Sequence, residues 1–125
     1  MIEIKKVEDP ALAKRICEEN NIVYNPCYRI IATVEGETIH NSAVFSYENE
    51  EGTIHVIDGF GGDLDLLDGL CRAILNIMDI NGVKEVYLPS KYEKLAKYVG
   101  FSQCEDRYKV QLEGFFCCSC SSKKQ

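Results

Sequence analysis

No stretch of this 125-residue sequence is apolar over the roughly 20 residues that a membrane-spanning helix needs. No apolar stretch follows the charged residues near the start of the chain either, so we expect no secretion signal. Basic residues are outnumbered, 14 against 20 acidic ones, and the net charge of −6 argues against a nucleic-acid surface, which needs positive charge to displace counterions from phosphate. The remaining composition, 46% apolar and 27% charged, is that of an ordinary globular protein. We therefore expect one domain over residues 1–118, a frayed tail over residues 119–125, and no membrane or nucleic-acid partner.

The seven cysteines are an odd number, and without a secretion signal they do not indicate a disulfide framework. The compartment that this predicts is a reducing cytoplasm. Cys17 and Cys71 fall within helical patterns, where a free thiol acts as a small buried apolar group.

The C-terminal tail contains a C-x-x-C spacing within Cys117, Cys118 and Cys120. Two thiolates at this spacing can meet one zinc ion or each other, but a structural zinc site needs four ligands. Cys104 would have to supply the fourth, because no second C-x-x-C is present, and we assign no metal ligands. Two interpretations stay open: thiols that respond to metal or oxidation, and thiols without a specific role.

Hydrophobic periodicity and turn residues predict an α+β domain with a mixed, largely antiparallel sheet. The predicted strands are residues 2–7, 28–34, 38–47, 53–58, 83–88, 107–112 and 115–118, and the predicted helices are residues 10–19, 63–80 and 91–99. Short polar turns join the second, third and fourth strands, which predicts a β-meander. A glycine-rich loop over residues 59–62 then precedes a long central helix, and a second helix follows towards the C-terminus.

This order of elements resembles that of the GCN5-related N-acetyltransferase (GNAT) family, with an α/β/α arrangement. The stretch LCRAILNIMDINGVKEVYL (residues 70–88) is similar to the family's central helix, its Gly-Val turn and the strand that follows. The stretch KLAKYVGF (residues 94–101) is similar to the family's helix that ends in Gly-Phe. The resemblance implies a short, degenerate member that takes acetyl-CoA as cofactor and passes the acetyl group to an amine. One N-terminal helix stands where two are usual, so the acceptor side would be abbreviated.

The resemblance also assigns a cofactor site to the fourth strand and the loop after it. It implies that the backbone around Val56 and Ile57 holds the pantetheine arm. It further implies that the backbone of Gly59, Phe60, Gly61 and Gly62, at a helix N-terminus, holds the pyrophosphate. The arginine or glutamine that usually opens the family's loop motif is absent here.

Charge opposes this assignment, because Asp63, Asp65 and Asp68 lie where a polyanion would dock. No lysine or arginine occurs between Arg29 and Arg72, a stretch that holds nine acidic residues. The alternative is that these aspartates favour the positive helix end and point to solvent, which leaves weak cofactor binding possible.

Proton transfer has two sets of candidates. Many family members place a general-acid tyrosine four residues before the glycine of Gly-Phe, but that position is Ala96 here, and we expect the neighbouring Tyr92 and Tyr98 to pack or lie half-exposed. The resemblance places the base near the end of the fourth strand, so we predict Asp58 or His55 as the catalytic residue.

The sequence thus predicts a GNAT-like acyltransferase whose acidic surface suits a cationic acceptor, either a small-molecule amine such as a polyamine or a lysine of a peptide. Two alternatives stay open. One is a catalytically inactive GNAT-fold binding or assembly module, which we would expect to dimerise or to hold a partner. The other is a metal- or redox-responsive protein that uses the C-terminal cysteines.

Overall fold

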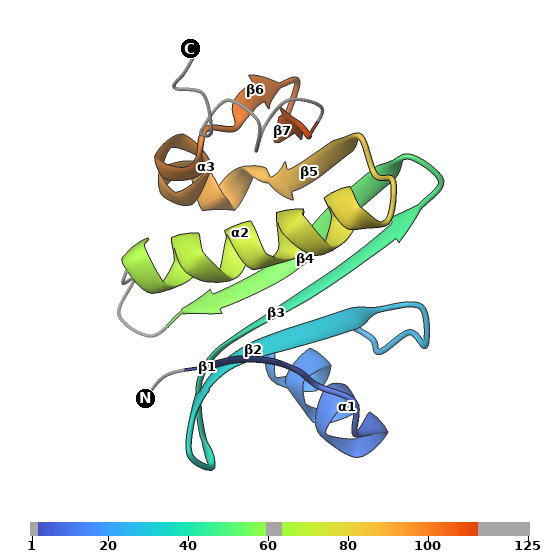
Figure 1. The fold of residues 1–125 in the computed structure, drawn as a ribbon, viewed down its shortest axis with the longest axis vertical. Helices are drawn as coiled ribbons and strands as arrows, with labels where there is room; N and C mark the ends of the chain where they lie inside the picture. The colour runs from blue at the N-terminus through green and yellow to red at the C-terminus, as the bar shows by residue number, and fades with distance from the viewer. Residues whose placement is uncertain (1–2, 60–63, 113–125) are drawn as a thin grey trace.

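The computed structural model describes residues 3–59 and 64–112, which form one seven-stranded sheet and its covering helices (Figure 1). The predicted contributions of Phe60, Gly61, Gly62, Asp63, the tail cysteines and the strand at residues 115–118 lie outside the described residues. The strands are β1 (Glu3–Lys6), β2 (Arg29–Glu35), β3 (Thr38–Glu48), β4 (Glu51–Gly59), β5 (Glu85–Pro89), β6 (Ser102–Cys104) and β7 (Arg107–Gln111). The helices are α1 (Pro10–Glu19), α2 (Leu64–Ile80), the 3-10 turn η2 (Ser90–Tyr92) and α3 (Glu93–Val99).

The strands lie in the order β1-β2-β3-β4-β5-β7-β6. Every neighbouring pair is antiparallel except β4 and β5, which run parallel. A parallel pair needs a crossover connection, and α2 supplies it (Figure 1). The α+β class, the meander β2-β3-β4 and the mixed, largely antiparallel sheet are therefore confirmed.

Two hydrophobic clusters cover the two faces of the sheet. The larger one joins α2 and α3 to the sheet, and the smaller one joins α1 to the other face. The smaller cluster consists of Ala13, Ile16, Cys17, Ile30, Val44 and Val56. Alternate residues of a strand face opposite sides, so β3 buries Val44 under α1 and Phe45 under α2. This two-sided burial explains why β3 shows only weak alternation of polar and apolar residues.

Helices α1 and α2 follow the predicted patterns closely. Asp9 caps α1 by accepting a hydrogen bond from the Ala11 N–H at 3.1 Å, and Pro10 is its first residue. The buried residues of α1 are Ala13, Ile16 and Cys17, and Glu19 at its end is exposed. Helix α2 buries Leu67, Leu70, Cys71, Ile74, Leu75 and Met78. Cys17 and Cys71 are fully buried, as expected.

The C-terminal part differs most from the prediction. The strand β6, at Ser102–Cys104, was not predicted and forms a hairpin with β7. The turn between them places Glu105 at φ 57°, a left-handed conformation. The predicted helix at residues 91–99 begins as the 3-10 turn η2 and becomes α-helical only at Glu93, which affects where Tyr92 lies. No helix in the described ranges is long and apolar enough to cross a membrane.

Gly52 and Gly69 offer a matched test of this packing. A Cβ on Gly52 would overlap Met78 Sδ and lie 2.9 Å from Met78 Cε, and Met78 is fully buried. We expect Gly52→Ala to lower the free energy of unfolding by about 1–3 kcal/mol through overpacking. The same change at Gly69, within α2 and with nothing within 4 Å of the added Cβ, should raise it by about 0.5–1 kcal/mol. Urea denaturation of the two variants measures both values, and equal effects would contradict the packing described here.

Candidate functional site

The parallel pairing of β4 with β5 ends early. Only Glu51, Gly52 and Thr53 pair with β5, although β4 continues to Gly59 and stays paired with β3 over that length. The backbone of β4 beyond Thr53 therefore has no ladder partner from β5. Backbone N–H groups at such an edge are free to hold a ligand, unless another group satisfies them.

A β-bulge gives a local cause for this divergence. Val56 pairs with Val44 while Ile54 pairs with Phe45, so His55 is an extra residue in β4. A bulge bends its strand and increases its twist, which turns β4 away from β5. It also brings His55 to the same face as Val56, where the imidazole stacks on Tyr28 with ring centroids 4.7 Å apart.

Tyr92 binds one of the β4 backbone N–H groups that do not pair with β5. Its hydroxyl accepts a hydrogen bond from the Ile57 N–H at 3.0 Å, in a partly buried position. Tyr92 belongs to η2, which follows β5 directly, so its side chain spans the gap from the β5 side. The expectation that Tyr92 packs is confirmed, because it lies against the larger hydrophobic cluster, but its contact with β4 was not predicted.

A groove of about 590 Å³ lies beside Tyr92, at the N-terminal part of α2. Its lining residues are Leu64, Leu67, Lys91, Tyr92, Glu93, Lys94 and Leu95. Lys91 of η2 and Lys94 of α3 thus bring positive charge to the groove, whereas the glycine-rich sequence at residues 59–62 contains no lysine or arginine. The Glu93 carboxylate already has two partners within the protein. It accepts a hydrogen bond from the Tyr108 hydroxyl at 3.4 Å and lies 3.6 Å from Lys97 Nζ.

The aspartates at the start of α2 are also engaged within the protein. Asp68 accepts from Arg72 Nε at 2.9 and 3.1 Å, one helical turn away. Asp65 accepts from the Tyr98 hydroxyl at 2.5 Å, which joins the first turn of α2 to the end of α3. Tyr98 itself is 48% exposed, as predicted. The charge of Asp68 is thus paired with a cation, and that of Asp65 is hydrogen-bonded.

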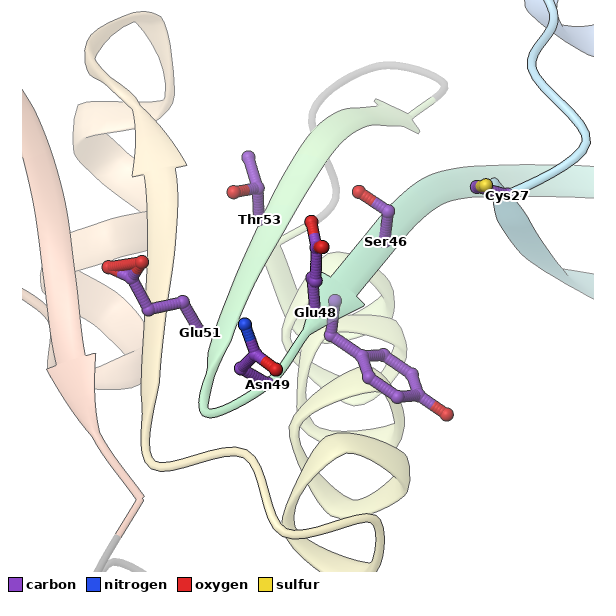
Figure 2. Close-up of a pocket in the computed structure, with 7 residues that line it drawn as sticks. Cys27, Ser46, Glu48, Asn49, Glu51 and Thr53 are labelled. Carbon is purple, nitrogen blue, oxygen red and sulfur yellow. The ribbon is translucent and has the colours of Figure 1, made fainter.

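The other face of the sheet carries a second cavity, of about 570 Å³, near the β3-β4 hairpin. It is lined by Cys27, Ser46, Tyr47, Glu48, Asn49, Glu51 and Thr53. Figure 2 shows Ser46, Glu48 and Thr53 projecting from the strands, with α2 behind them on the opposite face. We call this cavity the open-face pocket.

Of the two predicted catalytic residues, His55 lies next to this pocket. Its Nε2 is 2.7 Å from the Ser46 hydroxyl, and Ser46 lines the pocket. Burial lowers the pKa of His55 from its ordinary value of 6.5, so the imidazole is neutral at pH 7 and can accept a proton. For Asp58 the structure describes only the backbone, which pairs with Ser42 of β3.

The two buried cysteines of the described residues, Cys17 and Cys71, are not reactive groups. Burial raises the pKa of the Cys71 thiol to about 12, with Asp68 adding to the effect, and burial also raises that of Cys17. Thiols of this kind are inert. Among residues 3–59 and 64–112, no three cysteine, histidine or acidic side chains are grouped so as to hold a metal ion.

Comparisons with solved structures identify the fold. The chain superposes on spermidine/spermine N-acetyltransferase from Vibrio cholerae with a TM-score of 0.73 and 11% identity, over 95% of this chain and 99% of that one. A GNAT-family acetyltransferase from Staphylococcus aureus gives a TM-score of 0.67 at 11% identity, over 90% and 99% of the two chains. N-acetylglutamate synthase from Neisseria gonorrhoeae, solved with coenzyme A and N-acetyl-glutamate, gives 0.67 at 11% identity, over 90% of this chain and 35% of that one.

No family model and no curated protein matches the sequence. The chain therefore has the GNAT fold, as the sequence predicted, and at these identities the likeness shows the fold alone. Sequence analysis missed Tyr92, Lys91, Lys94 and Ser46 as site residues. The only signal available for Lys91 and Lys94 was their place at the start of the family-like helix.

The lowered pKa of His55 predicts how stability depends on pH. The folded state resists protonation of His55, so the unfolded state binds more protons as the pH falls below about 6.5. We expect the free energy of unfolding contributed by His55 to be constant above that pH and to fall below it. His55→Gln should remove this component, whereas the control His40→Gln, at a residue paired with Glu35, should keep it. Urea denaturation between pH 5 and pH 8 measures the difference, and identical profiles for the two variants would contradict it.

Proposed function

We propose that this protein binds acetyl-CoA and transfers the acetyl group to an amine. The observation that carries the proposal is the early end of the β4-β5 pairing, which leaves the Ile57 N–H bonded to a side-chain hydroxyl instead of a neighbouring strand. A backbone donor at an open strand edge suits an extended, amide-containing arm such as pantetheine. The fold is shared with acetyltransferases, but activity depends on the site, so the residues must support the chemistry themselves.

Such a cofactor would be held by the open edge of β4 and by the groove beside Tyr92. The backbone of Val56 and Ile57 would hold the arm, and that of Gly59, Phe60, Gly61 and Gly62 would hold the pyrophosphate. Lys91 and Lys94, at the groove wall, would supply the charge that neutralises phosphate. Asp65 and Asp68 oppose this less than their number suggests, because both already accept hydrogen bonds from protein donors. Bound acetyl-CoA supplies an activated thioester, and the other roles fall to side chains of the protein.

His55 would accept the proton of the attacking amine. It is neutral at pH 7, and the Ser46 hydroxyl at 2.7 Å connects it to the open-face pocket, where an acceptor can enter. Glu48 and Glu51 line the same pocket and would attract a cationic amine, such as a polyamine or a lysine side chain. Asp58, three residues further along β4, is the second candidate base.

Charge reversal of the two groove lysines tests the cofactor site. We expect acetyl-CoA to bind the unaltered protein, and Lys91→Glu/Lys94→Glu to weaken the binding by at least about tenfold, or about 1.4 kcal/mol. The control Lys5→Glu/Lys14→Glu makes the same change of net charge on β1 and α1, at the far end of the sheet, and should bind normally. Isothermal titration calorimetry measures the affinities, and mass spectrometry of spermidine or a lysine peptide detects transfer.

Absence of both heat and a melting shift at millimolar acetyl-CoA would contradict the proposal. The inactive binding module would then be the better explanation of the same fold. Binding without transfer to any amine would contradict the catalytic part alone.

Tyr92 should compete with the cofactor for the Ile57 N–H. In Tyr92→Phe this donor loses its partner in the free protein, so a ligand that accepts from it gains the difference. A neutral hydrogen bond contributes about 0.5–1.5 kcal/mol, so we expect acetyl-CoA to bind up to about tenfold more tightly. Tyr24→Phe, at a tyrosine packed against the α1 cluster, is the matched control. Weaker binding by Tyr92→Phe would instead mean that the hydroxyl holds the cofactor.

A further inference from the structure

Ser46 and His55 lie side by side on one face of the β3-β4 ladder. Ser46 pairs directly with Thr53 across the β3-β4 ladder, and a regular strand would place His55 on the same face two residues further along. The bulge shifts and twists β4 at this point, and the His55 Nε2 lies 2.7 Å from Ser46 Oγ. This distance is within the range for a nucleophile and its general base.

Both side chains are half-buried, and they differ in their relation to the open-face pocket. Ser46 lines the open-face pocket and, in Figure 2, points into it, whereas His55 is not among the lining residues. The Tyr28 ring packs against the His55 imidazole, with ring centroids 4.7 Å apart and an angle of 34° between the ring planes. With the ring proton on Nδ1, the Ser46 hydroxyl donates to Nε2, which leaves Oγ lone pairs directed towards the pocket.

We propose that Ser46 is a nucleophile that takes an acyl group from a small activated ester or thioester in the open-face pocket. This activity goes beyond the proposed transfer from acetyl-CoA, since direct attack by an amine needs no acyl-enzyme. It also uses neither the β4-β5 gap nor the groove lysines.

The step balances without an added reactant. The Ser46 proton passes to His55 Nε2 as Oγ bonds to the acyl carbon, and the tetrahedral adduct then expels the thiolate or alkoxide, which takes the proton back from His55. Water, deprotonated by His55, attacks the acyl carbon in turn and releases the carboxylic acid and free Ser46. Thr53, directly opposite Ser46, and Asn49 line the pocket and offer a hydroxyl and an amide as donors for the adduct oxygen.

The charge of the pocket limits the substrates. Glu48 and Glu51 are both lining residues, and the pocket includes no lysine or arginine. An ester that carries a carboxylate or phosphate near the acyl group would be repelled. The substrate class is therefore a neutral or cationic acyl ester whose size suits a cavity of about 570 Å³.

Reaction with p-nitrophenyl acetate, in the absence of coenzyme, tests the proposal separately from the acetyltransferase. We expect a burst of p-nitrophenolate equimolar with the protein, and an acetyl group mapped to Ser46 by mass spectrometry after acid quench. Ser46→Ala should abolish the burst, whereas Ser102→Ala, at an exposed serine of β6, should keep it. His55→Gln should slow acylation at least about a hundredfold, and His40→Gln should not.

Ser46→Cys keeps a nucleophile beside His55 and should restore a burst, which guards against a loss of folding in Ser46→Ala. An acetyl group on any other residue, or no acylation of Ser46, would overturn the proposal. Acetyl-CoA binding is measured independently of this assay, so failure of one proposal leaves the other standing.

Discussion

The short length of the β4-β5 pairing is the constraint on which the rest of the structure depends. Three residues of β4 pair with β5, and the bulge at His55 then turns the strand away. The divergence leaves the Ile57 N–H to Tyr92, and the extra residue of the bulge, His55, lies beside Ser46. One irregularity in one strand therefore lies between a gap on the β5 side and a hydrogen-bonded pair on the β3 side.

The distribution of charge explains how an acidic chain can offer a site to an anionic ligand. Near the start of α2, Asp68 is tied to Arg72 and Asp65 to Tyr98, while Lys91 and Lys94 approach the groove from η2 and α3. Glu48 and Glu51 lie on the opposite face of the sheet, around the open-face pocket. The two lysines and the two glutamates thus line different cavities, so a net charge of −6 says little about either site.

The sequence predicted the fold better than the site, for physical reasons. Helix α2 and the meander depend on local periodicity and turn residues, which a single sequence displays. Strand β6 is only three residues long, Ser-Gln-Cys, and is held by its pairing with β7, so no local pattern marks it. Tyr92 and Ile57 are 35 residues apart, and the contact of Ser46 with His55 depends on the register of β3 against β4, which the sequence does not display. The search for a tyrosine at a fixed offset before Gly100 missed Tyr92, because its position is set by η2 and the end of β5 rather than by the face of α3.

The single parallel pairing also divides the sheet into two antiparallel blocks, β1 to β4 and β5 to β7. Each block is held by its own antiparallel pairs, and α2 bridges them by packing its apolar face on the first block and on α3 of the second. A chain cut in the turn at Asn81-Gly82 would leave every antiparallel pair intact within one fragment or the other. We therefore expect the two fragments from such a cut to reassemble into the same fold, because the buried face of α2 joins them.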